Sequence, residues 1–232
     1  MFLTFDPLYW MILLPCLALS GLCTLWVKSA FAKWSQVAAS NGMTGAQIAK
    51  AILDWNGVHD VTIEPSQGFL SDHYDPRSKT LRLSPQNFSG RSVAALGIAA
   101  HEVGHAIQHA RAYAPLQLRS AMVPLTMLGS NLAFPLLFAG MFLHLSGLVL
   151  VGVALFGLST LFTLVTLPVE FDASRRAMIA LREGHILEGE ELSGARKVLT
   201  AAASTYVAAA ITSLATLFYF LLRSGLLGGR SD

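Results

Sequence analysis

The stretch Ala99-Ala100-His101-Glu102-Val103-Gly104-His105-Ala106-Ile107 carries the pattern His-Glu-x-x-His within an apolar segment of helical periodicity. On a helix, two histidines four residues apart lie on one face, so both imidazoles can reach a single metal ion. Glu102 lies between them, where it can accept a proton from a water molecule. The stretch therefore predicts a zinc hydrolase site with one Zn²⁺ ion, His101 and His105 as ligands and Glu102 as the general base.

The helix around this motif is expected to run from near Val93 towards Tyr113 and to end before Pro115. Ser89 or Ser92 is placed to cap its first turn, since a serine side chain can accept a hydrogen bond from a backbone N–H at a helix start. The motif then falls in the middle of a helix, where both histidines have a fixed geometry.

A small α+β region precedes this helix. Thr44 is placed to begin a helix that Gly57 ends. Residues Val61–Glu64 and Thr80–Leu83 alternate as strands do, and a turn-rich segment, Ser71–Arg77, separates them. We expect a small β-hairpin, with Thr80–Leu83 as an edge strand that can pair with an extended peptide.

The composition is that of a membrane protein. Hydrophobic residues make up 53% of the chain and charged residues only 13%, and the mean hydropathy is +0.54. Soluble domains carry about 25% charged residues. Four apolar stretches are long enough to cross a lipid bilayer, at about residues 7–27, 122–143, 148–167 and 201–222.

The expected fold class is a mainly α membrane protein with about four transmembrane helices and a zincin-like cytoplasmic α+β part. The predicted parts are a retained N-terminal anchor (1–27), the part with the His-Glu-x-x-His helix (28–120), a transmembrane hairpin (121–168), a cytoplasmic helical segment (169–200) and a last transmembrane helix with its tail (201–232).

The positive charges predict the orientation. Of 16 Lys and Arg residues, all but Arg223 and Arg230 lie in segments 28–120 and 169–200. The positive-inside rule then places both segments in the cytoplasm and the N-terminus outside, which agrees with four crossings. A net charge of +2 without a basic run argues against nucleic acid binding. The small residues of the last span fit packing within one chain or between subunits, so the oligomeric state stays open.

A hydrolytic zinc site needs a third protein ligand. The metzincin pattern is excluded, because Gln108 and Arg111 stand where its glycine and third histidine would be. His109 lies about 12 Å along the helix from His101, too far to share the ion, and we expect it to support the site or to lie on the surface.

A carboxylate from a second helix is the favoured third ligand. Pro168 suits a helix start, and Glu170 and Asp172 follow within the first turns. Acidic residues also stabilise helix starts by themselves, so this position alone does not establish Glu170 as a ligand. The other candidates, His73, Asp75 and His185, lie in turn-like or exposed segments.

These motifs resemble those of known membrane metalloproteases. The combination of a His-Glu-Val-Gly-His helix and a downstream Glu-Phe-x-Ala resembles the gluzincin site of the HtpX-like and CAAX-prenyl-protease-type enzymes. The order of parts over nearly the whole chain is more similar to the YugP-like family of bacterial neutral zinc metallopeptidases. The segments that carry this similarity are 71–76, 100–109, 113–115, 118–120, 129–131 and 167–177.

The resemblance implies that Glu170 is the third zinc ligand. The HtpX-like pattern continues with an acidic residue, which orients a ligand histidine in those enzymes, where this chain has Ser174. Asp172 is the candidate to take over that supporting role.

The predicted function is that of a zinc metalloendopeptidase in the bacterial plasma membrane, with its active site facing the cytoplasm. His73 and Tyr74 are candidates to stabilise the oxyanion of the transition state. The expected substrates are proteins or peptides near the membrane surface, in a role such as quality control of membrane proteins. The alternative is a catalytically inactive zinc-binding scaffold or adaptor, in which Glu102 would not be needed.

Overall fold

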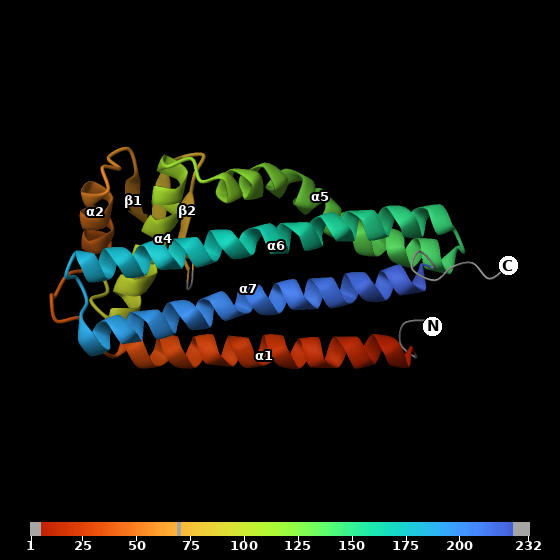
Figure 1. The fold of residues 1–232 in the computed structure, drawn as a ribbon, viewed down its shortest axis with the longest axis horizontal. Coiled ribbons are helices and arrows are strands. Elements are labelled where there is room, and N and C mark those ends of the chain that lie inside the picture. The colour runs from red at the N-terminus through yellow and green to blue at the C-terminus, as the bar shows by residue number, and fades with distance from the viewer. Residues whose placement is uncertain (1–5, 69–70, 225–232) are drawn as a thin grey trace. The chain divides into compact units, whose positions relative to one another are not determined.

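The computed structural model describes residues 6–68 and 71–224. In chain order, its elements are α1 (Pro7–Ser35), α2 (Gly45–Trp55), β1 (Thr62–Pro65), β2 (His73–Asp75), β3 (Thr80–Leu83), α3 (Pro85–Phe88), α4 (Val93–Ala110), α5 (Ala114–Phe142), α6 (Ser146–Glu183) and α7 (Gly189–Arg223) (Figure 1).

The chain forms two compact units. The bundle unit comprises Met1–Leu22, Leu118–Leu167 and Thr205–Asp232, and the mixed unit comprises Cys23–Gln117 and Pro168–Ser204. Each unit has its own hydrophobic core.

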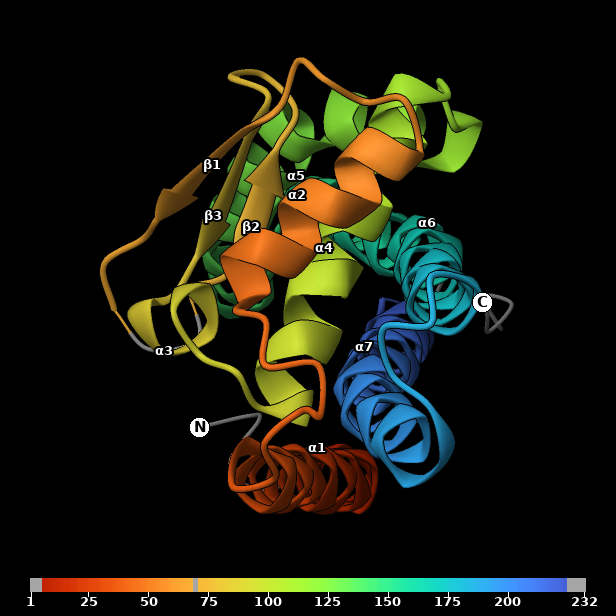
Figure 2. The same ribbon diagram turned by 90° about the vertical axis from the view of Figure 1, so that its left-hand side faces the viewer.

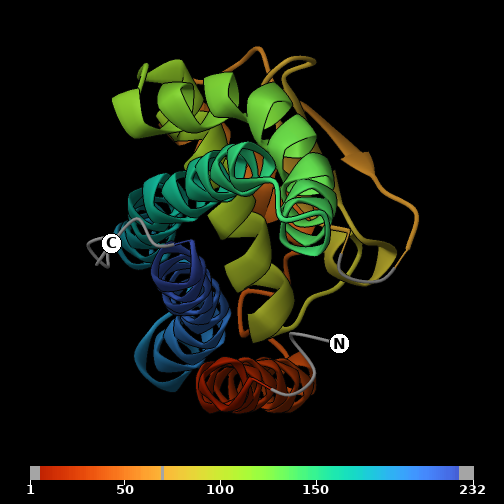
Figure 3. The ribbon, with the colours of Figure 1, turned by 90° about the vertical axis from the view of Figure 1, so that its right-hand side faces the viewer.

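In the bundle unit, parts of four long helices lie side by side in the order α5, α6, α7, α1 (Figure 3). A Cβ atom on Gly152 of α6 would lie 2.7 Å from the Leu137 side chain of α5, so glycine permits this close crossing. Thr160 of α6 and Ser213 of α7 join their hydroxyls at 2.8 Å. The Tyr219 hydroxyl donates to Asp6 at the start of α1, at 2.9 Å.

Helices α1, α5, α6 and α7 are all long and apolar enough to cross a membrane. Many of their leucine, phenylalanine and methionine side chains are exposed, which suits a surface that faces lipid. The prediction of a mainly helical protein with four candidate membrane spans is therefore confirmed.

The predicted helix start at Pro168 is wrong. Helix α6 runs from Ser146 to Glu183 with Pro168 in its interior. Proline removes one backbone donor from a helix, but the turns on either side can keep their own hydrogen bonds, and long apolar helices tolerate it. Glu170 therefore lies deep within a long helix and not in a first turn.

In the mixed unit, α4 is the central element (Figure 2). It packs against α2 and the sheet, and it contacts the mixed-unit parts of α6 and α7 through its glycines. The Ser92 side chain accepts from the Ala95 N–H at 3.2 Å, which confirms Ser92 as one of the two predicted caps, while Ser89 ends α3. Thr44 caps α2 as predicted, in a capping box with Gln47.

The strand pairing differs from the prediction. The sheet has the order β1-β3-β2, in which β1 and β3 are parallel and β2 and β3 are antiparallel. A hairpin does precede α4, but His73–Asp75 is its first strand, and Thr80–Leu83 is the central strand and not an edge. An alternating pattern indicates that a segment is a strand, but it does not indicate which strand pairs with it. The three-residue β2 is also too short to show alternation.

Candidate metal centre

His101, His105 and Glu170 converge in the mixed unit. Their ligand atoms all lie within 4.8 Å of one another. Glu170 Oε2 is 3.3 Å from His101 Nε2 and 3.7 Å from His105 Nε2. The two imidazole rings are nearly perpendicular, at 84°, with centroids 4.8 Å apart. Two nitrogens and one carboxylate oxygen are thus directed towards a common point.

Close packing of α4 against α6 makes this convergence possible. A Cβ atom on Gly104 would lie 2.5 Å from the Ala173 carbonyl oxygen, so any larger residue would push the helices apart. Ala173 is itself fully buried. Gly104 lies just before His105, and Ala173 lies three residues after Glu170, so the crossing point of the helices is next to the ligand cluster.

The donor set fits a zinc ion. Zinc accepts imidazole nitrogens and carboxylate oxygens at about 2.0–2.2 Å in tetrahedral geometry, which places neighbouring ligand atoms about 3.3 Å apart. The two distances to Glu170 Oε2 are close to that spacing. Three protein ligands also leave a fourth position for water, as in hydrolytic sites. These residues can therefore hold one metal ion.

Glu102 lies beside the cluster in a nearly dry environment, with 8% of its surface exposed. Burial raises the pKa of its carboxyl from 4.5 to about 7, and the charges of Glu170 and Asp72 act in the same direction. His101 and a hydrogen bond from the Tyr74 backbone N–H oppose this rise. A carboxyl with a pKa near neutrality is suited to accept and return a proton.

Both histidines have a hydrogen-bond partner on the ring nitrogen that faces away from Glu170. His101 Nδ1 lies 3.1 Å from Ser174 Oγ, and His105 Nδ1 lies 3.1 Å from Gln108 Oε1. Ser174 itself thus contacts one ligand histidine, whereas Asp172, the predicted supporting residue, contacts neither histidine directly and accepts from Gln108 at 3.0 Å.

The side chains of the other predicted supporting residues have hydrogen-bond partners other than the three ligands. The Tyr74 hydroxyl and His109 Nδ1 are 2.8 Å apart, so these two side chains bond each other. Burial, together with Asp60 and Asp75, raises the pKa of Tyr74 to about 12, so its hydroxyl stays protonated. His73 is exposed and its Nδ1 contacts the Ser71 carbonyl.

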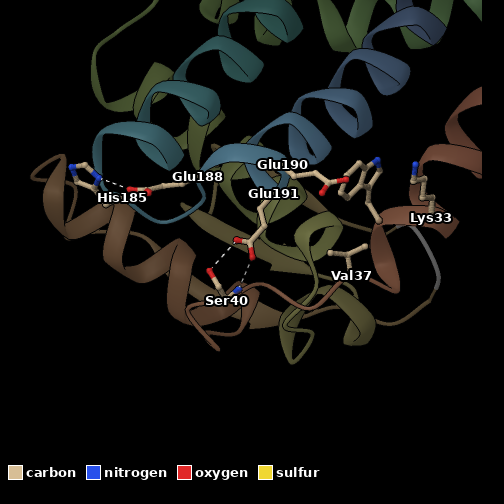
Figure 4. A pocket seen from close by; sticks show the side chains of 8 residues that line it. Lys33, Val37, Ser40, His185, Glu188, Glu190 and Glu191 are labelled. Carbon is tan, nitrogen blue, oxygen red and sulfur yellow. Dashed lines mark hydrogen bonds and ion pairs between the residues drawn. The ribbon is translucent and has the colours of Figure 1, made fainter.

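The competing ligand candidates have other partners. Asp75 accepts from the Arg77 N–H and the Ser78 hydroxyl within its turn. His185 pairs with Glu188 at 2.7 Å in a separate pocket of the mixed unit, which is also lined by Lys33 and Glu190 (Figure 4). Among the described residues, the metal-ligand cluster contains neither of them.

The sequence reasoning missed the roles of Gln108 and Ser174. In the sequence, Gln108 stands out only as a departure from the metzincin pattern. Its position three residues after His105 was an available signal, because residues i and i+3 lie on the same face of a helix. Ser174, four residues after Glu170, is likewise on the ligand face of α6.

A His-Glu-x-x-His helix that meets a glutamate on a second helix, together with four apolar helices of membrane-spanning length among the described residues, is typical of membrane zinc metallopeptidases. Residues 9–225 match a family described as "Putative neutral zinc metallopeptidase", and the chain belongs to this family. The chain is also 48% identical over 211 residues to "Putative membrane protease YugP" of Bacillus subtilis (strain 168), covering 90% of this chain and 93% of that protein. No solved structure matches.

Proposed function

We propose that this protein is a membrane-embedded zinc metalloendopeptidase that cleaves peptide bonds at the cytoplasmic surface of the membrane. The observation that carries the proposal is the convergence of His101, His105 and Glu170 within 4.8 Å, next to a buried Glu102. Membership of a zinc metallopeptidase family supports the same activity.

A zinc ion held by these three residues would activate a water molecule and polarise the scissile carbonyl. Glu102 accepts the proton of the attacking water and then delivers it to the departing amine. Its pKa near 7 suits both steps. The Tyr74 N–H, on strand β2, orients the Glu102 carboxylate through its hydrogen bond.

The charge distribution supports a cytoplasmic site. The mixed unit, which contains the cluster, also carries most of the Lys and Arg residues, whereas few occur in the bundle unit. By the positive-inside rule, such segments stay in the cytoplasm. With Cys16 and Cys23 replaced by alanine, single cysteines introduced at exposed Lys50 and Glu183 should then be protected from a membrane-impermeant thiol reagent in intact cells.

The substrates we propose are proteins or peptide segments near the membrane surface, as in quality control of membrane proteins. Pairing of substrate with Thr80–Leu83 is excluded, because β3 is hydrogen-bonded to strands on both sides. The edges of this sheet belong to β1 and β2.

The decisive experiment measures zinc content and cleavage of an unfolded protein such as casein, with the full chain in detergent. Glu102→Gln should retain zinc and lose at least about 100-fold in cleavage rate, because it removes the general base. Glu170→Ala should lose zinc as well as cleavage. Glu183→Gln, an exposed glutamate in the same helix as Glu170, is the control and should behave as the unchanged protein.

Cleavage by Glu102→Gln at the unchanged rate would contradict the peptidase mechanism. Zinc binding without cleavage of any protein, by the unchanged chain, would instead favour the inactive scaffold.

A further inference from the structure

Gln108 is a fully buried polar side chain that links α4 to α6. Its Oε1 lies 3.1 Å from His105 Nδ1. Its Nε2 donates to the Val169 carbonyl at 2.8 Å and to Asp172 Oδ2 at 3.0 Å. Val169 and Asp172 lie on either side of Glu170 in the sequence, so this one amide connects the second histidine with the segment that carries the third ligand.

The partners of Gln108 fix the orientation of its amide. The Val169 carbonyl and the Asp172 carboxylate only accept hydrogen bonds, so the NH₂ group must face them. The amide oxygen then faces His105 Nδ1, and an oxygen can only accept. His105 must therefore carry a proton on Nδ1, so Nε2 is the ring nitrogen available to a metal ion, and Glu170 Oε2 lies 3.7 Å from it.

Asp172 is itself held in place. Arg175 donates to its Oδ1 at 2.6 Å and Arg176 to its Oδ2 at 2.5 Å. Arginine groups only donate hydrogen bonds, so both hold the carboxylate oxygens in place as acceptors, and Oδ2 also accepts from Gln108. The orientation of the amide thus depends on a network anchored on α6.

We propose that Gln108 is the positioning residue of this site: it fixes the tautomer and ring orientation of His105 and holds the imidazole in place relative to Glu170. Metal-binding histidines depend on such a partner on their other ring nitrogen, and loss of the partner weakens metal binding about 10- to 100-fold. Ser174 does not fix the tautomer of His101 in the same way, because a hydroxyl can either donate or accept a hydrogen bond.

This inference rests on the proposed zinc site, so the test begins with the unchanged full-length protein in detergent. Zinc affinity is measured by competition with a chelator, and the visible absorption of Co²⁺ in place of zinc reports the ligand geometry. Gln108→Met keeps the size of the side chain and removes its hydrogen bonds. It should bind zinc about 10- to 100-fold more weakly, with a changed Co²⁺ spectrum.

Asn87→Leu is the matched control. Asn87 is also a buried amide that donates to an aspartate, Asp72, at 2.9 Å, and it lies in α3, which carries none of the three ligands. This variant should lose stability as Gln108→Met does, yet keep zinc affinity within about twofold and leave the Co²⁺ spectrum unchanged.

The double variant Gln108→Glu with Asp172→Asn provides a rescue. It keeps an acceptor for His105 Nδ1 and offers an amide donor from position 172, while the Val169 carbonyl loses its donor, so the rescue is partial. The double variant should bind zinc more tightly than Gln108→Met and shift the Co²⁺ spectrum back towards that of the unchanged protein, and it keeps the test valid if Gln108→Met does not fold.

Three results would overturn the role of Gln108: unchanged zinc affinity and spectrum in Gln108→Met, equal losses in Gln108→Met and Asn87→Leu, or a failed rescue. Absence of zinc binding by the unchanged protein would instead refute the proposed function.

Discussion

The bundle unit and the mixed unit both depend on close helix crossings, but they bury different groups there. At the α5–α6 crossing of the bundle unit, Gly152 meets Leu137. At the α4–α6 crossing of the mixed unit, Gly104 meets the backbone of Ala173, and Glu102 and Glu170 are buried beside it. The first crossing joins apolar surfaces, whereas the second brings ionisable groups together.

This difference shows which of the two units is destabilised by the groups that form its site. In the bundle unit, buried hydroxyls pair with each other, as Thr160 does with Ser213, or with Asp6 at the start of α1, as Tyr219 does. A buried hydroxyl needs only one neighbouring oxygen as its hydrogen-bond partner, because it can donate or accept. The mixed unit buries carboxylates, which are costly in a dry environment unless they are paired or protonated. Variants of matched positions in the two units can test this contrast.

The largest expected effect is the pH dependence that Glu102 gives to the metal-free protein. Its pKa is about 7 in the fold and 4.5 as a free side chain. Between these values the folded state keeps a proton that the unfolded state has lost, so stability falls as pH rises from about 4.5 to about 7. Glu102→Gln removes this penalty and should be more stable by about 3 kcal/mol above pH 7, with no difference below pH 4.5.

Unfolding of the chelator-treated protein in detergent at pH 4.5 and pH 8 measures this difference. Glu183→Gln, at an exposed position, should show no such dependence. A Glu102→Gln variant with equal gains at both pH values would show that burial does not shift the Glu102 pKa.

The two glycine crossings give the next effect. Gly104→Ala places a Cβ atom 2.5 Å from Ala173, and Gly152→Ala places one 2.7 Å from Leu137. Both should destabilise the protein by about 1–3 kcal/mol through overpacking. Only Gly104→Ala should also weaken zinc binding, because it separates the helices that carry the ligands.

Thermal unfolding and chelator competition measure these two quantities. Gly21→Ala is the control, since its added Cβ would meet nothing within 4 Å. Equal losses of zinc affinity in Gly104→Ala and Gly152→Ala would remove the distinction between the crossings.

Ser174→Ala tests a hydroxyl contact at the metal cluster. It removes the 3.1 Å contact to His101 Nδ1, so the imidazole loses its orienting partner. Zinc affinity should fall about tenfold, at the lower end of such effects. Chelator competition checks this, and an affinity equal to that of the unchanged protein would show that Ser174 does not orient His101.

Thr160→Val removes the corresponding helix–helix hydroxyl contact of the bundle unit, and it has the smallest expected effect. Interhelical hydrogen bonds in membranes contribute about 0.6 kcal/mol. Stability in detergent should fall by about that amount, and zinc affinity should not change. A loss of zinc binding here would mean that the bundle unit also determines the geometry of the site.

Local patterns were enough to predict much of this molecule. Four apolar stretches indicated four membrane-spanning helices, because the length and composition of a segment suffice to identify one. The i, i+4 spacing of His101 and His105 placed both on one face of α4, because helix periodicity fixes that relation. Ser92 and Thr44 marked helix starts through their capping side chains.

Contacts between distant segments were harder to predict. The sheet order places β3 between two strands, and a short segment such as His73–Asp75 gives no sign of its partner. The course of α6 through Pro168 was also missed, because local preference favours a helix start there.

Length, composition and periodicity are enough to specify the elements of this protein and the chemistry of each side chain: apolar helices for a membrane, two histidines on one helical face and a glutamate on another helix. Which atoms meet is set by the packing of these elements, namely Glu170 with both histidines, Ser174 with His101 and Gln108 with His105. The reason is physical: periodicity acts within one helix, whereas these contacts arise from the crossing of α4 and α6, which depends on the space left by Gly104.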